Sequence, residues 1–146
     1  MSSWNRRNNI SSTYRVHYVT DLISTTDECD EYFFEEGCYI LELSNTAADA
    51  EVSIARARVP PGIKTRRHRL HGITERYVIL EGHGRVEVGD LLARDVTSGD
   101  VIRIPPDTNQ CIRNTGENDL VFLAVCTPRF NRSAYEDTED NQTAIA

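Results

Sequence analysis

Long hydrophobic runs are missing from this chain of 146 residues. A membrane-spanning helix needs about 20 consecutive apolar residues, and no segment of this sequence approaches that length. The first residues also lack the apolar centre of a signal peptide, so a cytoplasmic location is the expectation.

Paired cysteines and an excess of positive charge are absent as well. The four cysteines include no C-x-x-C pair. In a chain without a secretion signal, we expect them to be reduced and partly buried rather than joined in a disulfide framework. The net charge of −7 argues against nucleic acid as a partner.

Helical periodicity is also weak, and strand signals are present in its place. Between Cys38 and Thr127, short apolar or alternating runs are separated by glycine, proline and asparagine. Such spacing is typical of a β-sandwich or barrel. The expected strands are 39–43, 51–59, 64–70, 76–80, 85–88, 91–96, 101–104, 110–114 and 120–127.

Charge is divided between two blocks. Residues 27–51 contain nine acids and no lysine or arginine, whereas residues 56–76 contain seven such bases and one acid. One interpretation is that the blocks form ion pairs, within a subunit or across a dimer. The other is that the bases surround a pocket and attract an anionic ligand. Arg56 and Arg58 alternate with small residues, and the sequence leaves open which set faces the interior.

The expected organisation is a single domain with polar ends. Residues 1–20 form a flexible arm with a possible edge strand, residues 21–130 a barrel, and residues 131–146 a mobile acidic tail. A barrel with exposed edge strands needs cover. Together with the divided charge, this predicts a homodimer.

One stretch carries a specific pattern of glycines, a histidine and a carboxylate. Gly62, His68, Glu75 and Gly82 match the pattern G-x5-H-x-H-x3-4-E-x6-G, and Leu70 stands where the second histidine is expected. His68 and residue 70 share a strand face, because side chains alternate. His71 would face the other way unless the strand ends early.

A second block follows the pattern G-x5-P-x-G-x2-H-x3-N. It begins at Gly99 and includes Pro105 and Asn114, but Asp107 replaces a glycine and Gln110 replaces the histidine. With these two motifs the chain resembles small single-domain bacterial cupins over roughly residues 40–130, in particular those labelled mannose-6-phosphate-isomerase-like. The resemblance implies an all-β double-stranded β-helix, or jelly-roll barrel.

The resemblance also implies a metal site inside the barrel. The corresponding ligands are His68, Glu75 and Gln110, and the metal would be divalent zinc, manganese, iron or nickel. An amide oxygen is a weaker donor than imidazole for such metals, so both an occupied and a lost site are open. Glu75 precedes an apolar run and must be paired, metal-bound or protonated.

Two functions remain open from the sequence, beside a third possibility, a structural or partner-binding barrel with a relic site. The first is an enzyme of isomerase, epimerase or lyase type, acting on a small polar anionic substrate such as a sugar derivative or carboxylic acid. The alternative is a non-catalytic small-molecule-binding cupin with a relic metal site. The residues expected to form the site are His68, Glu75 and Tyr77 for catalysis, and Gln110, Arg56, Arg58 and Arg66 for substrate binding.

Overall fold

The computed structural model describes residues 22–139 and contains eleven strands and three 3-10 turns. The strands are β1 (Tyr32–Phe34), β2 (Cys38–Ser44), β3 (Ser53–Val59), β4 (His68–Leu70), β5 (Thr74–Glu81), β6 (His83–Val88), β7 (Arg94–Thr97), β8 (Val101–Ile104), β9 (Gln110–Asn114), β10 (Leu120–Thr127) and β11 (Tyr135–Asp137). The 3-10 turns are η1 (Glu28–Asp30), η2 (Ala47–Asp49) and η3 (Arg132–Ala134). Within the described range, no helix is long and apolar enough to cross a membrane.

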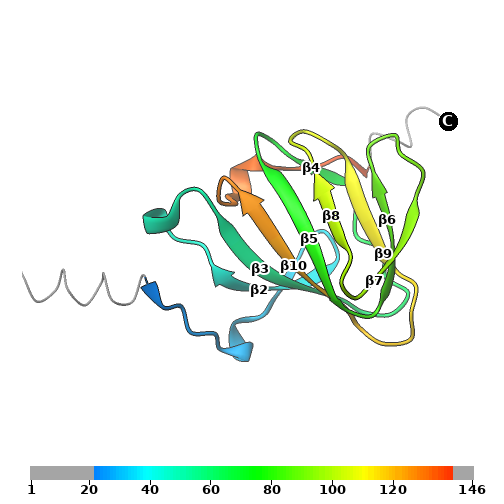
Figure 1. The fold of residues 1–146 in the computed structure, drawn as a ribbon, viewed down its shortest axis with the longest axis horizontal. Coiled ribbons are helices and arrows are strands. Elements are labelled where there is room, and N and C mark those ends of the chain that lie inside the picture. The colour runs from blue at the N-terminus through cyan, green and yellow to red at the C-terminus, as the bar shows by residue number, and fades with distance from the viewer. Residues whose placement is uncertain (1–21, 140–146) are drawn as a thin grey trace, which may run out of the picture.

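The strands form two antiparallel sheets that face each other. One sheet has the order β1-β2-β3-β10-β5-β8 and the other β11-β4-β9-β6-β7. Figure 1 shows β10 between β3 and β5 in the first sheet, and β9 beside β6 in the second. This is the all-β jelly-roll architecture that the strand spacing predicted, and the expected central strands are present.

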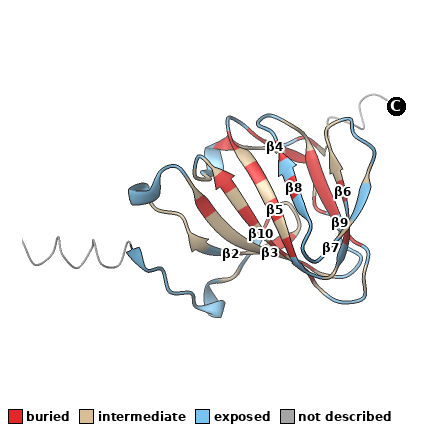
Figure 2. Cartoon of the chain, viewed as in Figure 1, coloured by how far each residue is buried: buried red, intermediate tan, exposed pale blue. Residues whose placement is uncertain are grey.

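Strand alternation builds the core between the sheets. Along β10, every second residue is buried, beginning at Leu120, and β5 follows the same pattern (Figure 2). The ring of Phe122 is 2% exposed and lies 4.3 Å, centroid to centroid, from the ring of Tyr77. Burying a side chain of this size contributes about 2 to 3 kcal/mol relative to an exposed one.

Alternation on β3 settles which of its residues face inward. Ala55 and Ala57 line the space between the sheets. Arg56 and Arg58 therefore lie on the outer face, because neighbouring strand residues point to opposite sides. Small inner residues leave room in the barrel at this point, and the arginines are free to meet the acidic block.

The acidic segment around η1 pairs with those outer arginines. Glu31 lies 2.6 Å from the Arg58 guanidinium, and Glu28 accepts hydrogen bonds from Arg56. The Arg58 guanidinium also lies 4.3 Å from the centroid of the Tyr39 ring. The blocks thus pair within one chain, so the divided charge gives no separate reason for a dimer. The homodimer stays a prediction that depends on the exposed sheet edges.

The C-terminal residues differ from the expected tail. The sequence predicts a mobile acidic tail over residues 131–146, but η3 and β11 lie in its first part, and β11 pairs with β4 through Asp137 opposite His68. Two ion pairs, Arg66 with Asp137 and Arg69 with Glu136, hold this strand in place. Residues 1–20, expected to form an arm, lie outside the described residues.

Candidate functional site

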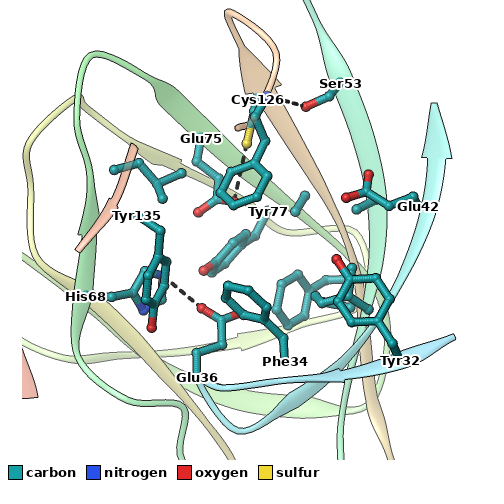
Figure 3. Close-up of a pocket in the computed structure, with 17 residues that line it drawn as sticks. Tyr32, Phe34, Glu36, Glu42, Ser53, His68, Glu75, Tyr77, Cys126 and Tyr135 are labelled. Carbon is teal, nitrogen blue, oxygen red and sulfur yellow. Dashed lines mark hydrogen bonds and ion pairs between the residues drawn. The ribbon is translucent and has the colours of Figure 1, made fainter. Parts of the chain in front are cut away.

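A small cavity lies between the sheets at the end of the barrel that β1 and β11 cover. Its free volume is about 50 Å³, which is room for a few water molecules or a small ligand group. Among the residues that the structure describes, the lining includes six aromatic side chains, three glutamates and one histidine, but no lysine or arginine. Figure 3 shows the polar side chains directed into this space from several strands.

His68 occupies one side of the cavity with its two ring nitrogens in different roles. Its side chain is 3% exposed. Nδ1 lies 2.7 Å from the backbone oxygen of Arg66, and Nε2 lies 3.1 Å from Oε2 of Glu36. Because Nδ1 must donate to the carbonyl, Nε2 and Glu36 share the remaining proton, carried by one or the other. The ring also stacks on Tyr135 at 5.1 Å.

Glu75 enters the same cavity from β5. It accepts a hydrogen bond from the Gln110 amide, 2.9 Å from Nε2 to Oε1, and one from the Cys126 thiol at 3.5 Å. Burial raises the pKa of Glu75, and the charge of a protonated His68 opposes part of that rise. The carboxyl is therefore a buried group that tends to keep its proton.

Tyr77 and Gln110 complete the network around Glu75. The Tyr77 hydroxyl donates to Oε1 of Gln110 at 2.6 Å. Burial raises the pKa of Tyr77 well above its usual value, so the phenol keeps its proton. Gln110 is fully buried and lies opposite His68 in the β4–β9 register. Both the oxygen and the nitrogen of its side-chain amide form hydrogen bonds, so Gln110 holds Glu75 and Tyr77 in position.

Glu36 is one of the site residues that the sequence did not identify. It lies in the turn between β1 and β2, where its other oxygen accepts from the Cys38 thiol at 2.9 Å. The backbone oxygen of Glu36 accepts from the Arg66 amide, which fixes the turn against the strand of His68. Nothing in the local sequence separates it from its neighbour Glu35, which forms an exposed ion pair with Arg132.

The expected metal ligands do not fit a metal in this arrangement. The Gln110 oxygen accepts from Tyr77, and its amide nitrogen, which repels a cation, faces Glu75. His68 directs Nδ1 at a carbonyl and Nε2 at Glu36. In residues 22–139 no group of three or more histidine, cysteine, aspartate or glutamate side chains could hold a metal ion.

The other predicted positions divide between the cavity and the outer surface. Leu70 lines the cavity on the same strand face as His68, as alternation predicted. Arg56, Arg58 and Arg66 are not brought to the cavity, because each is directed to acidic partners outside it.

His71 does not reach the cavity either. It lies beyond the end of β4, where Nδ1 is 2.8 Å from Oδ1 of Asp107 and Nε2 faces Glu136. Asp107 has a positive φ of 60°, a conformation that glycine adopts without strain and that aspartate tolerates better than most residues. The aspartate that replaces the motif glycine thus supplies a partner for His71.

Comparisons with known proteins agree with this architecture. A model of the cupin domain matches residues 55–126. The uncharacterized protein MJ1618 of Methanocaldococcus jannaschii is 36% identical over 115 residues, which are 77% of this chain and 89% of that protein. These matches concern the family, and they do not separate the mannose-6-phosphate-isomerase-like subgroup from other cupins.

Solved structures with the same fold include one that is described as an enzyme. Pac13, described as a nucleoside dehydratase and known from Streptomyces, has a TM-score of 0.65 at 16% identity, over 79% of this chain and 90% of that one. KdgF from a Halomonas species has a TM-score of 0.64 at 18% identity, over 74% and 95%. A double-stranded β-helix protein of Klebsiella pneumoniae has 0.63 at 13%, over 75% and 91%. At these identities the likeness concerns the fold alone.

Proposed function

The chain belongs to the cupin domain family, and we propose that its barrel is an acid–base enzyme of the isomerase, epimerase or lyase type. Its substrate is a small polar molecule with an acidic C–H beside a carbonyl or a leaving hydroxyl. His68 with Glu36 moves one proton, Glu75 holds a second, and Tyr77 orients the substrate. Gln110 is a positioning residue, since it contacts Glu75 and Tyr77 rather than the cavity.

One observation carries this proposal. Two proton-carrying groups, the His68–Glu36 pair and Glu75, line the same small cavity and approach it from different strands. Isomerisation and elimination each need one group that removes a proton and another that returns one. The two groups have different surroundings, because Glu75 is buried against a neutral amide while Glu36 has an imidazole partner.

The walls of the cavity support proton transfer. Aromatic rings line the cavity, with Phe34 and Tyr135 at 5.1 Å in an edge-to-face contact. Excluding water strengthens the electrostatic interactions inside and limits loss of the proton to solvent. A neighbour of the same fold is described as a nucleoside dehydratase, which is a precedent for elimination chemistry in such a barrel and no more.

The residues that line the cavity do not favour the anionic substrate expected from the sequence. An anionic substrate would need cations in the lining, and the arginines expected to supply them pair with acids outside the cavity. No step of the proposed reaction requires a metal, since the donor set around Gln110 is arranged for hydrogen bonds.

The test is isotope exchange. The protein is incubated in D₂O with a panel of hydroxy and amino carbonyl compounds, and NMR follows deuterium incorporation and new products. His68→Gln and Glu75→Gln should each abolish exchange, while His71→Gln, a histidine outside the cavity, should retain it. Exchange that persists in both cavity variants would contradict the proposal.

A second candidate, a non-catalytic binding protein, is favoured by one observation. The Tyr77 hydroxyl, the Gln110 amide and the Glu75 carboxyl are already hydrogen-bonded to one another. A pocket organised in this way can hold a ligand without converting it. Stabilisation by a compound that shows neither exchange nor turnover would favour this candidate.

A further inference from the structure

We infer that the cavity selects a small ligand carrying a positive charge, such as a protonated or quaternary amine, with the cationic group seated beside Glu42. The inference deepens the proposed function, since it names the substrate class of the same cavity. It reverses the sign of charge expected from the sequence.

The first argument is the charge inventory of the lining. Glu36, Glu42 and Glu75 all line the cavity, and no lysine or arginine of residues 22–139 joins them. His68 faces Glu36 and can balance that carboxylate alone. Glu75 tends to keep its proton because burial raises its pKa, so Glu42 is the acid that lacks a cation among the described lining residues. A ligand cation would supply the charge that the chain itself places elsewhere, whereas an anion would meet two further carboxyls in a space with little water.

The second argument is the aromatic part of the lining. Tyr32, Phe34, Phe130 and Tyr135 all border the cavity. The faces of such rings attract cations, and ammonium groups are bound in proteins by aromatic side chains combined with carboxylates. The Phe34 ring already attracts one cation of the chain, since the Arg132 guanidinium lies 5.3 Å from its centroid.

The position of Glu42 separates binding from chemistry. In Figure 3, Glu42 and Tyr32 lie on one side of the cavity, and His68 with Glu36 lies on the other. A ligand with its ammonium beside Glu42 would therefore extend its carbon atoms toward the two proton-carrying groups.

The surroundings of Glu42 predict how pH acts on binding. Burial raises the pKa of Glu42, and a hydrogen bond from Tyr32 opposes part of that rise. Among the described residues, the titratable groups that act on Glu42 are Tyr32 of β1 and Cys126 of β10. Burial raises the pKa of both, so neither is charged at neutral pH. Arg132 acts on Tyr32 but pairs with Glu35. Raising the pH ionises Glu42, so a cation should bind more tightly.

The experiment uses three probes with equal numbers of heavy atoms: tetramethylammonium, tert-butanol and methanesulfonate. None of them titrates near neutral pH, so any pH dependence belongs to the protein. Calorimetry should show tetramethylammonium binding about ten-fold more tightly than tert-butanol, with methanesulfonate weakest. The affinity for tetramethylammonium should rise as the pH is raised above 4.5, because the Glu42 carboxyl then loses its proton.

Two variants test whether Glu42 is the residue that binds the cation. Glu42→Gln keeps the shape of the side chain and should remove most of the preference for tetramethylammonium. Glu81→Gln, at the exposed end of β5, is the matched control and should leave the preference unchanged. Methanesulfonate as the best ligand, equal binding of all three probes, or binding of none would overturn the inference. Isotope exchange by His68 and Glu75 would be unaffected by those results, so the two proposals fail separately.

Discussion

His68 and His71 lie close together in the sequence, and each faces a carboxylate, yet their surroundings are opposite. The His68 side chain is 3% exposed and lines the cavity, whereas that of His71 is 49% exposed and lies at the rim. Both nitrogens of His71 face carboxylates, Asp107 and Glu136, which raises its pKa. His68 faces one carboxylate and one backbone carbonyl.

The difference in surroundings suits His71 to a structural role and His68 to acid–base chemistry. A ring whose two nitrogens both meet carboxylates holds both protons and joins β4, the loop before β9 and β11 as a cation. A ring that donates one proton to a backbone carbonyl keeps the other nitrogen for exchange with its carboxylate partner. Acid–base chemistry needs the second arrangement, because a proton must be both held and released.

Replacing each histidine by glutamine should give the largest difference between the two positions. His68→Gln should lower turnover about a hundred- to ten-thousand-fold, since it removes a positioned acid–base group. His71→Gln should change turnover by less than about three-fold, because the ring lies outside the cavity. The measurement is the rate of isotope exchange on a substrate found in the panel. Similar losses in both variants would show that the rim is part of the chemistry.

Histidines introduced inside the cavity should bind a metal better than a histidine introduced outside it. Leu70 lines the cavity beside His68, and Gln110 lies opposite His68 on β9. The double variant Leu70→His/Gln110→His should therefore bind zinc at least about ten-fold more tightly than the parent, since imidazole is the better donor. Calorimetry with zinc measures this.

The matched control for that variant is Arg69→His, which adds a histidine to the other face of the same strand. It should give no comparable gain, because residue 69 points away from Glu75. A double variant with unchanged zinc affinity would show that residues 70 and 110 do not face a common point.

The pH dependence of stability should differ between the cavity and the rim. Burial raises the folded pKa of Glu75 above 4.5, so the folded state holds its proton more tightly than the unfolded chain does. Stability from this group is therefore present below about pH 4.5 and falls as pH rises toward the folded pKa, by at most about 1.4 kcal/mol per pH unit. Urea unfolding across this range should show a shallower fall for Glu75→Gln. An identical slope in the parent and the variant would contradict the burial of an ionisable Glu75.

The smallest expected effect comes from His71. Its folded pKa is raised above 6.5 by hydrogen bonds to Asp107 and Glu136. The stability it contributes is present below about pH 6.5 and is lost as pH rises through the folded pKa. Since the pairs are exposed, the effect should be small and should weaken in salt. Thermal melts of His71→Gln at two pH values and two salt concentrations measure it, with the exposed His83→Gln as control. A salt-independent loss would contradict an ion-pair role.

The sequence by itself determined the fold and half of the site. Glycine spacing and strand alternation predicted the barrel, and alternation placed His68 and Leu70 on one inner face. These features are local, because a side chain in a strand points to one face or the other.

Only the tertiary structure decided how charge is distributed. Glu36 reaches His68, and Arg56 meets Glu28, through contacts between residues far apart in the chain. No local pattern marks Glu36 as a site residue while Glu35 faces solvent, since that depends on how a turn packs on a distant strand. Composition gives the number of charged residues, but burial and ion pairing decide which of them face the cavity.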